Sequence, residues 1–437
     1  MSLDLHTQCL ERLTDTVAKG LESVAVEKQI FLRPASALSM LDADSVLPSD
    51  KRRALQEHVS DNPVFDFVFD RLSTELIETQ KYTPEKPISK LMELDGYADL
   101  RAVATRLVGD LCSLPWQYAL SIRLPNGIGS ILSRVTSNYA LSDAIRLVTP
   151  DDAFSAEYPL SSGIEARDRS LAGGLQGQLS ANLLRGHSEL RWDTESALLQ
   201  VYVKGFIGMY GTTAPLEDAV DYVKSFLGIA IALRLLRVEK RLSRTPSEAT
   251  MFVHRKATDK WIIERKVELD PPQSETFEAL VIHDLGGSLN SEEAREAWAQ
   301  RILHKIKCVF SQEPRSRRLL LASQWLFDSY CGSNELLSFV QTAVVIEILL
   351  GDKAASDLMG LSELLRNRCA YLISATPGER EMVLRDFRSI YDVRSKIVHK
   401  GKKRLSSEEQ ALFTKLQWIC QRVILKESEL FQTEAST

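Results

Sequence analysis

A single charged residue interrupts the apolar face of a long helix predicted near the end of this 437-residue chain. At about 100° per residue, the apolar positions of the stretch 383–398 fall on one face of that helix. They are Val383, Phe387, Ile390, Tyr391, Ile397 and Val398. Arg394 falls in the middle of the same face. Because an unpaired guanidinium is costly to bury, Arg394 must meet a carboxylate inside the protein or face a cleft or interface that receives an anion.

His399 lies close to Arg394 on the same predicted helix. It follows five residues later, which places it about 140° round the helix and roughly 7 to 8 Å along the axis. A guanidinium presents fixed donors to phosphate oxygens, and an imidazole that titrates near neutral pH can transfer a proton. The two side chains are therefore a candidate site for chemistry at a phosphate group.

The run from Ile390 to His399, IYDVRSKIVH, resembles the signature helix of HEPN domains, which are all-helical modules with an Arg-x4-6-His motif. It is most similar to the Apea-like branch, where a helix with a Glu-x-Leu-Leu-like step and a helix with an Arg before a Leu-rich stretch precede the motif. This chain has IEILLG at 346–351 and LLRNRCAYL at 364–372, in that order. The resemblance covers residues 319–429, about a quarter of the chain, and nothing comparable is found upstream.

The resemblance implies a metal-independent endoribonuclease whose catalytic residues are Arg394 and His399. RNA carries its own nucleophile, the 2′-hydroxyl, so the protein has to move protons and stabilise the charge that develops at phosphorus. In HEPN nucleases two half-sites meet across a helical interface. Since this chain has one convincing motif, the resemblance implies a homodimer, an RNA substrate and no cofactor. Ser395 stands where many nucleolytic members have Asn, Asp or His, and it fits the Apea-like branch.

A carboxylate is available to pair with the motif arginine. Glu347 is the only charged residue between Glu335 and Asp352, in a predicted helix that is apolar nearly all round. Such a group needs a partner, and we expect either Arg394 or Arg368, although an unrelated lysine or a backbone amide would also serve. Arg368 is expected to be a structural partner rather than a catalyst.

Cations gather around the motif although the chain is acidic. The net charge of -5 argues against general coating of nucleic acid. Between residues 379 and 404, however, nine Lys or Arg oppose four acids. This charge suits a phosphate backbone, while a solvated helix end would account for it more simply. The residues expected to support catalysis or to contact RNA are Ser395, Lys396, Lys400, Lys402, Lys403 and Arg404.

Composition and patterning predict an α+β multidomain protein in the cytoplasm. Hydrophobic residues make up 44% and charged residues 26%, as in soluble globular proteins. The six cysteines include no Cys-x2-Cys pair, so neither a zinc site nor a disulfide scaffold is indicated. The N-terminus has no signal pattern, and the longest apolar runs, 226–236 and 343–350, are too short to span a membrane.

The chain divides into four expected parts. Residues 1–115 are predicted to be mainly helical, and 116–290 to form a mixed α/β sensing or regulatory domain that contains a sheet. Residues 291–318 are predicted as a linking helix after a turn-forming segment at 286–291, and 319–437 as an all-α HEPN-like bundle. In the middle part we predict a turn at 125–127, a helix from about 212 to 241, and strands at 118–124, 198–207, 250–254, 261–269 and 277–282.

Three other motifs carry weaker signals. Arg53 and His58 repeat the Arg-x4-His spacing without supporting helices, which is typical of a solvated helix face. The glycine-rich stretch 172–178 matches neither a Walker loop nor a dinucleotide fingerprint, and we interpret it as a loop. The strand segment 264–266, Glu-Arg-Lys, is similar to half of a metal-dependent nuclease motif, with Asp259 nearby, but an exposed strand face explains it more simply.

Family analogy extends the predicted activity to a biological role. An RNase of this type would act as an antiphage, abortive-infection or toxin-like effector, with a trigger ligand or protein received by the region before 290. Two alternatives remain open. One is a catalytically silent HEPN module that binds RNA or a nucleotide, and the other is a regulatory or scaffold protein that acts through its middle domain.

Overall fold

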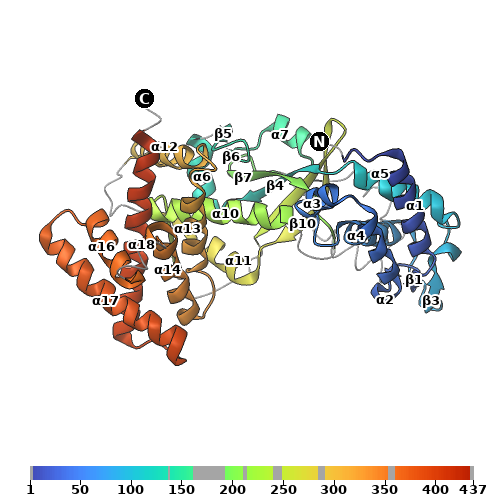
Figure 1. The fold of residues 1–437 in the computed structure, drawn as a ribbon. Helices are drawn as coiled ribbons and strands as arrows, with labels where there is room; N and C mark the ends of the chain where they lie inside the picture. The colour runs from blue at the N-terminus through green and yellow to red at the C-terminus, as the bar shows by residue number, and fades with distance from the viewer. Residues whose placement is uncertain are drawn as a thin grey trace.

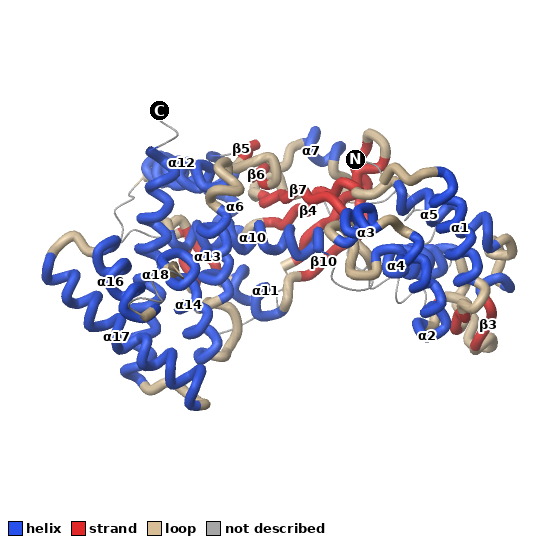
Figure 2. The backbone as a smooth tube through the Cα atoms, in the orientation of Figure 1, coloured by secondary structure: helices blue, strands red, loops and turns tan. Residues whose placement is uncertain are grey.

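Helices form both ends of the molecule and a sheet forms its middle (Figures 1 and 2). The computed structural model describes residues 3–135, 138–160, 192–209, 214–239, 249–283, 291–352 and 360–433. The expected mix of helices and strands is confirmed. Within these ranges every helix is too short or too polar to cross a lipid bilayer.

The N-terminal region has its own hydrophobic core. Its helices are α1 (Thr7–Leu21), α2 (Pro34–Ala37), α3 (Ser49–Gln56), α4 (Pro63–Thr79) and α5 (Leu100–Cys112), with two 3-10 turns, η1 (Leu38–Val46) and η2 (Leu91–Glu93). A small antiparallel sheet, ordered β2-β1-β3, was not predicted, because its strands β1 (Ala25–Glu27), β2 (Phe31–Leu32) and β3 (Ile88–Lys90) are too short to show a period. Phe206 and Trp116 pack against this core from the middle region.

A six-stranded antiparallel sheet organises the middle region in the order β10-β9-β4-β7-β6-β5. Its strands are β4 (Trp116–Arg123), β5 (Asn138–Ala140), β6 (Ile145–Val148), β7 (Leu198–Gly205), β9 (Thr250–Ala257) and β10 (Lys260–Glu268). Four of the predicted strands are therefore confirmed, as β4, β7, β9 and β10. Helix α10 (Ala214–Ala232) packs against the sheet, and α7 (Asp152–Glu157) joins an aromatic cluster that includes Ala119 and Leu198 of the sheet.

Two predictions in this region are wrong, the helix from about 212 to 241 and the strand at 277–282. Helix α10 ends at Ala232, and residues 236–238 form a strand instead. The turn predicted at 125–127 is present, because the carbonyl of Pro125 accepts hydrogen bonds from the amides of Ile128 and Gly129, and it opens α6 (Asn126–Val135). The predicted strand 277–282 is split between α11 (Pro271–Glu278) and β11 (Leu280–Ile282). Pro271 and Pro272 start a helix well, and only β11 pairs, with β8 (Leu236–Val238).

The C-terminal helices share a buried core with the sheet. They are α12 (Glu292–Phe310), α13 (Arg317–Asp328), α14 (Glu335–Leu350), α16 (Leu361–Ile373), α17 (Pro377–Lys400) and α18 (Ser407–Thr433). One hydrophobic cluster runs from Tyr118 of the sheet to Ile424 of α18. The expected division at 290 therefore does not separate two cores, and the boundary segment 284–290 itself lies outside the described residues.

Helix α12 is more than the link expected at 291–318. The hydroxyl of Ser291 caps it by accepting a hydrogen bond from the amide of Ala294. It buries Trp298, Leu303 and Ile306, and it contacts both α6 and α18. The linking helix therefore belongs to the shared core.

Candidate functional site

The predicted motif helix is α17, and its ends are well determined by local sequence. Thr376 caps its start by accepting a hydrogen bond from the amide of Glu379, and Pro377 occupies the first turn. The helix ends at Gly401, whose φ of 62° is in the left-handed region that favours glycine. This one helix therefore contains both motif residues, Arg394 and His399.

The apolar face of α17 is buried over most of its length. Val383, Phe387 and Ile390 are buried, which agrees with the predicted face, and Val393, which was not counted in that face, is buried as well. Val398 was expected there too, but it is 49% exposed. Burial falls off in the last turn of the helix, so an apolar residue beside the motif faces solvent in the single chain.

Arg394 lies against a carboxylate from the neighbouring helix α14. Its Nη2 is 3.0 Å from Oε1 of Glu347, and the hydroxyl of Tyr391 donates to the same carboxylate at 3.2 Å. The side chains of Arg394 and Glu347 are 25% and 21% exposed. The pairing of these two residues is one of the two arrangements that the sequence predicted. It resolves the cost of a cation on an apolar face, and it gives the guanidinium a fixed position.

Tyr391 is a member of the site that sequence reasoning missed. It was counted only as part of the apolar face, whereas its hydroxyl donates to Glu347. Burial raises the pKa of the Tyr391 phenol, and the neighbouring Glu347 carboxylate raises it further. The signal in the sequence was its position three residues before Arg394, on the same side of the helix.

Arg368 does not pair with Glu347. Its Nη1 donates to the carbonyl of Leu350 at 2.9 Å, and its Nη2 lies 3.4 Å from Asp352. The guanidinium of Arg318 donates to the carbonyl of Ile348 at 3.0 Å. Both arginines thus satisfy carbonyls at the C-terminal end of α14, where free carbonyls and the helix dipole favour cations. These contacts support the structural role expected for Arg368, but its partners are Leu350 and Asp352 instead of Glu347.

His399 and most of the predicted RNA-contacting residues are exposed. His399 is exposed, and it makes no hydrogen bond or ion pair within the described ranges. The other exposed residues of this set are Ser395, Lys396, Lys400, Lys403 and Arg404. The expectation that Lys402 is free to contact RNA needs correction, because its Nζ lies 2.9 Å from Glu409 at the start of α18. That ion pair connects the segment just after α17 to α18, so Lys402 is not one of the unpaired cations near the motif.

The second Arg-x4-His spacing is not a site. Helix α3 ends at Gln56, so Arg53 and His58 do not share a helix. His58 instead contributes its backbone carbonyl, which accepts a hydrogen bond from the amide of Phe206. The interpretation of this copy as a solvated helix face holds for Arg53, which is exposed in α3, but not for His58, which lies beyond the helix and is half-buried.

The Glu-Arg-Lys segment of β10 is not the exposed strand face that the sequence suggested, because the side chain of Glu264 is only 19% exposed. Glu264 occupies a β-bulge, pairs with Arg255 at 3.3 Å, and has its pKa raised by burial. Arg265 donates to the backbone carbonyls of Gly208 and Ile207. No cluster of three or more His, Cys, Asp or Glu that could hold a metal occurs in the described ranges. The glycine-rich stretch 172–178 lies outside them.

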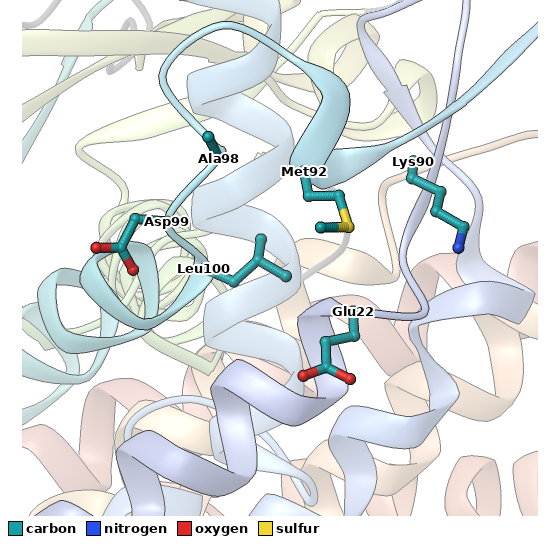
Figure 3. Close-up of a pocket in the computed structure, with 6 residues that line it drawn as sticks. All are labelled: Glu22, Lys90, Met92, Ala98, Asp99 and Leu100. Atoms are coloured by element: carbon teal, nitrogen blue, oxygen red, sulfur yellow. The ribbon is translucent and has the colours of Figure 1, made fainter.

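A groove of about 570 Å³ opens in the N-terminal region (Figure 3). Two of its polar groups are used locally. Asp99 caps α5 by accepting from the amide of Ala102, and the backbone of Lys90 is bound by Glu93. The remaining labelled residues are Glu22, Met92, Ala98 and Leu100. We assign it no role in the chemistry.

No protein-family model matches the chain, and no curated protein or solved structure is significantly similar to it. The case for a function therefore depends on the residues and their geometry.

Proposed function

We propose that the C-terminal helical unit, residues 319–437, is a metal-independent endoribonuclease of the HEPN type. One observation supports this most strongly. The ion pair with Glu347 of α14 holds the Arg394 guanidinium in place on the motif helix. His399 follows five residues later, is exposed among cations, and has no hydrogen-bond or ion-pair partner in the described part of the chain. A fixed anion-binding group beside a free proton-transfer group is what cleavage of RNA through its 2′-hydroxyl requires.

Each residue has a proposed part in that reaction. The imidazole of His399 takes the proton from the 2′-hydroxyl or returns one to the leaving 5′-oxygen. Arg394 keeps its charge at every accessible pH and binds the phosphate oxygens as negative charge accumulates there. Lys400, Lys403 and Arg404 contact the flanking phosphates. A second copy supplies the other half of the site, with exposed Val398 at the contact.

By the same resemblance, we propose that the enzyme acts in antiphage defence, abortive infection or toxin-like growth arrest. The N-terminal region and the sheet would then restrain the nuclease or receive its trigger. The continuous core between the sheet and α18 supports this, because a change at the sheet has a packed route to the C-terminal helices.

The test is cleavage of total RNA and tRNA by purified protein with EDTA present. Wild type is compared with Arg394→Ala, His399→Ala and, as a matched control, Lys305→Ala on α12. We expect cleavage by wild type and the control only, with products that end in 2′,3′-cyclic phosphate or 3′-phosphate. Cleavage retained by His399→Ala, or products with 3′-hydroxyl ends, would contradict the proposal.

A binding module without cleavage is the second candidate. The ion pair with Glu347 neutralises Arg394 in the single chain, and this favours a structural guanidinium over one that is free to bind phosphate. RNA binding measured by filter retention separates the two. If wild type and His399→Ala bind RNA equally and neither ever cleaves it, the module binds without catalysing.

A further inference from the structure

Two exposed aromatic rings lie on the C-terminal helices, apart from the motif residues. Tyr371 on α16 is 69% exposed, and Trp418 on α18 is 43% exposed. Within the described ranges these are the only aromatic residues that are exposed rather than buried or half-buried. Aromatic rings contribute large apolar areas when they are covered, so two open rings on one helical unit indicate a contact surface.

An arginine lies against each of these rings. The guanidinium carbon of Arg380, near the start of α17, is 4.4 Å from the centroid of the Tyr371 ring. That of Arg422, one turn after Trp418 on α18, is 5.7 Å from the centroid of the Trp418 ring. Neither guanidinium forms an ion pair in the part of the chain that the structure describes. Both cations are therefore oriented by a ring and are not neutralised by a carboxylate.

The two ring and arginine pairs lie close together, at the end of the molecule opposite α1 (Figure 1). Nη2 of Arg422 donates to the carbonyl of Ile373 at 3.3 Å, and Ile373 is the last residue of α16. Tyr371 precedes it by two residues, and Arg380 follows on the next helix. The hydrogen bond from Arg422 thus joins the two pairs into one surface, which we call the arginine-aromatic surface.

Most acids beside this surface are already engaged. Glu379 accepts a hydrogen bond from the amide of Ala375 at 2.7 Å, and Asp386 pairs with Lys415 at 2.8 Å. Glu381 has no partner within the described ranges, but it points about 100° round α17 from its neighbour in sequence, Arg380. The guanidiniums therefore favour an anionic ligand that also offers flat rings.

The arginine-aromatic surface is separate from the motif. Arg380 and His399 lie near opposite ends of α17, roughly 28 Å apart along its axis at 1.5 Å per residue. A ligand that contacts both places must be long, as a polynucleotide strand is.

We propose that the arginine-aromatic surface binds single-stranded RNA. Unpaired bases stack on the rings of Tyr371 and Trp418, and the guanidiniums of Arg380 and Arg422 contact the phosphates. In a duplex the faces of the bases are already stacked, so a single strand is preferred. The choice of RNA as the ligand rests on the proposed function, but binding does not require cleavage.

Fluorescence anisotropy with the full chain tests the surface. The probe is a labelled RNA single strand of about 20 nucleotides in which every 2′-hydroxyl is methylated, so that it cannot act as a nucleophile. Tyr371→Ala and Trp418→Ala are each expected to weaken binding at least about fivefold, or about 1 kcal/mol. Arg380→Gln is expected to weaken binding and to reduce its dependence on salt. Ile88→Ala and Arg53→Gln are matched controls, because both residues are exposed in the N-terminal region, and they should bind as wild type does.

Three outcomes would overturn the proposal. The first is no binding of the single strand by wild type at about 100 μM. The second is affinity in both ring variants equal to that of wild type, which would leave the surface to a protein partner. The third is equal affinity of wild type for the single strand and for its duplex. Circular dichroism verifies the fold of each variant.

This test is distinct from the test of the nuclease. If the ring variants lose binding while wild type never cleaves RNA, the arginine-aromatic surface is supported and the nuclease is not. If wild type cleaves RNA and the ring variants bind the probe as tightly as it does, the nuclease is supported and the surface is contradicted.

Discussion

At the scale of single residues, the motif arginine is as much a structural group as a functional one. Its pairing with Glu347 and the hydrogen bond from Tyr391 form a three-membered contact between α14 and α17. The sequence predicted this carboxylate because a lone charge on an apolar helix needs a partner. The sequence alone could not show whether Glu347 pairs with Arg394 or with Arg368, because the pairing depends on how α16 and α17 pack.

Removal of the Glu347 charge should cost stability. Glu347→Gln leaves a largely buried guanidinium without its counterion, and we expect a loss of about 1 to 3 kcal/mol in the free energy of unfolding. Urea denaturation measures the loss. Glu381→Gln is the control, because Glu381 is exposed on α17, the helix of Arg394, and has no partner in the described ranges. Equal stability of the two variants would show that the pair contributes nothing.

His254 makes folding pH-dependent. It is fully buried on β9, and burial lowers its pKa from 6.5 to about 4. The unfolded chain therefore takes up a proton below pH 6.5 while the folded chain does not, so stability falls as the pH drops from 6.5 toward 4. The 2.5 unit difference corresponds to about 3 kcal/mol.

The measurement is urea denaturation at several pH values between 6.5 and 4, for wild type and for His254→Gln. We expect a shallower decline in the variant. The raised pKa of Glu264 acts in the opposite direction, but it is common to both proteins and cancels in the difference. Parallel declines would contradict the assignment to His254.

At the scale of elements, the sequence predicted what depends on local patterning. The strong alternation of β4 and β7 was identified with nearly correct bounds. The errors fall where tertiary contacts decide, as in the end of α10 before β8 and the helix α11 before β11. The hydrogen bond from Nε of Arg146 on β6 to the amide oxygen of Gln200 on β7 was missed because 54 positions separate the two residues and only strand register joins them.

The contact between α10 and α13 depends on one glycine. A Cβ at Gly228 would lie 1.8 Å from the carbonyl oxygen of Ser323, so the two helices approach too closely for any side chain there. We expect Gly228→Ala to lower the free energy of unfolding by about 2 to 4 kcal/mol, because the helices must separate. Thermal or urea unfolding measures the effect.

Gly109→Ala is the matched control for that experiment. Gly109 lies inside α5, and a Cβ there meets nothing within 4 Å. The same substitution should therefore be neutral or stabilise the protein by up to about 1 kcal/mol. If Gly228→Ala is also neutral, the close helix contact is not present in solution.

At the scale of the whole molecule, the proposed mechanism needs two copies. Val398 is exposed near the motif, and an apolar residue at the centre of a contact does not tolerate a charge. We expect Val398→Asp to convert a homodimer into a monomer and to abolish cleavage, as measured by light scattering after size exclusion. Ile262→Asp is the control, since Ile262 is exposed to a similar degree, 40%, on β10.

A wild-type monomer at micromolar concentration would contradict the dimer. A dimer that persists in Val398→Asp would place the contact elsewhere. The dimer was expected only from the resemblance to HEPN proteins, because an interface between copies leaves no trace in the periodicity of one chain.

The central claim is that the 2′-hydroxyl of RNA is the nucleophile and that His399 moves its proton. The most direct measurement is cleavage, in EDTA, of an RNA oligonucleotide with a single 2′-deoxy nucleotide at the mapped cleavage position. The account predicts that wild type cuts the all-RNA strand there, that it leaves the substituted strand intact, and that His399→Ala cuts neither. Cleavage of the substituted strand at the same position would contradict it.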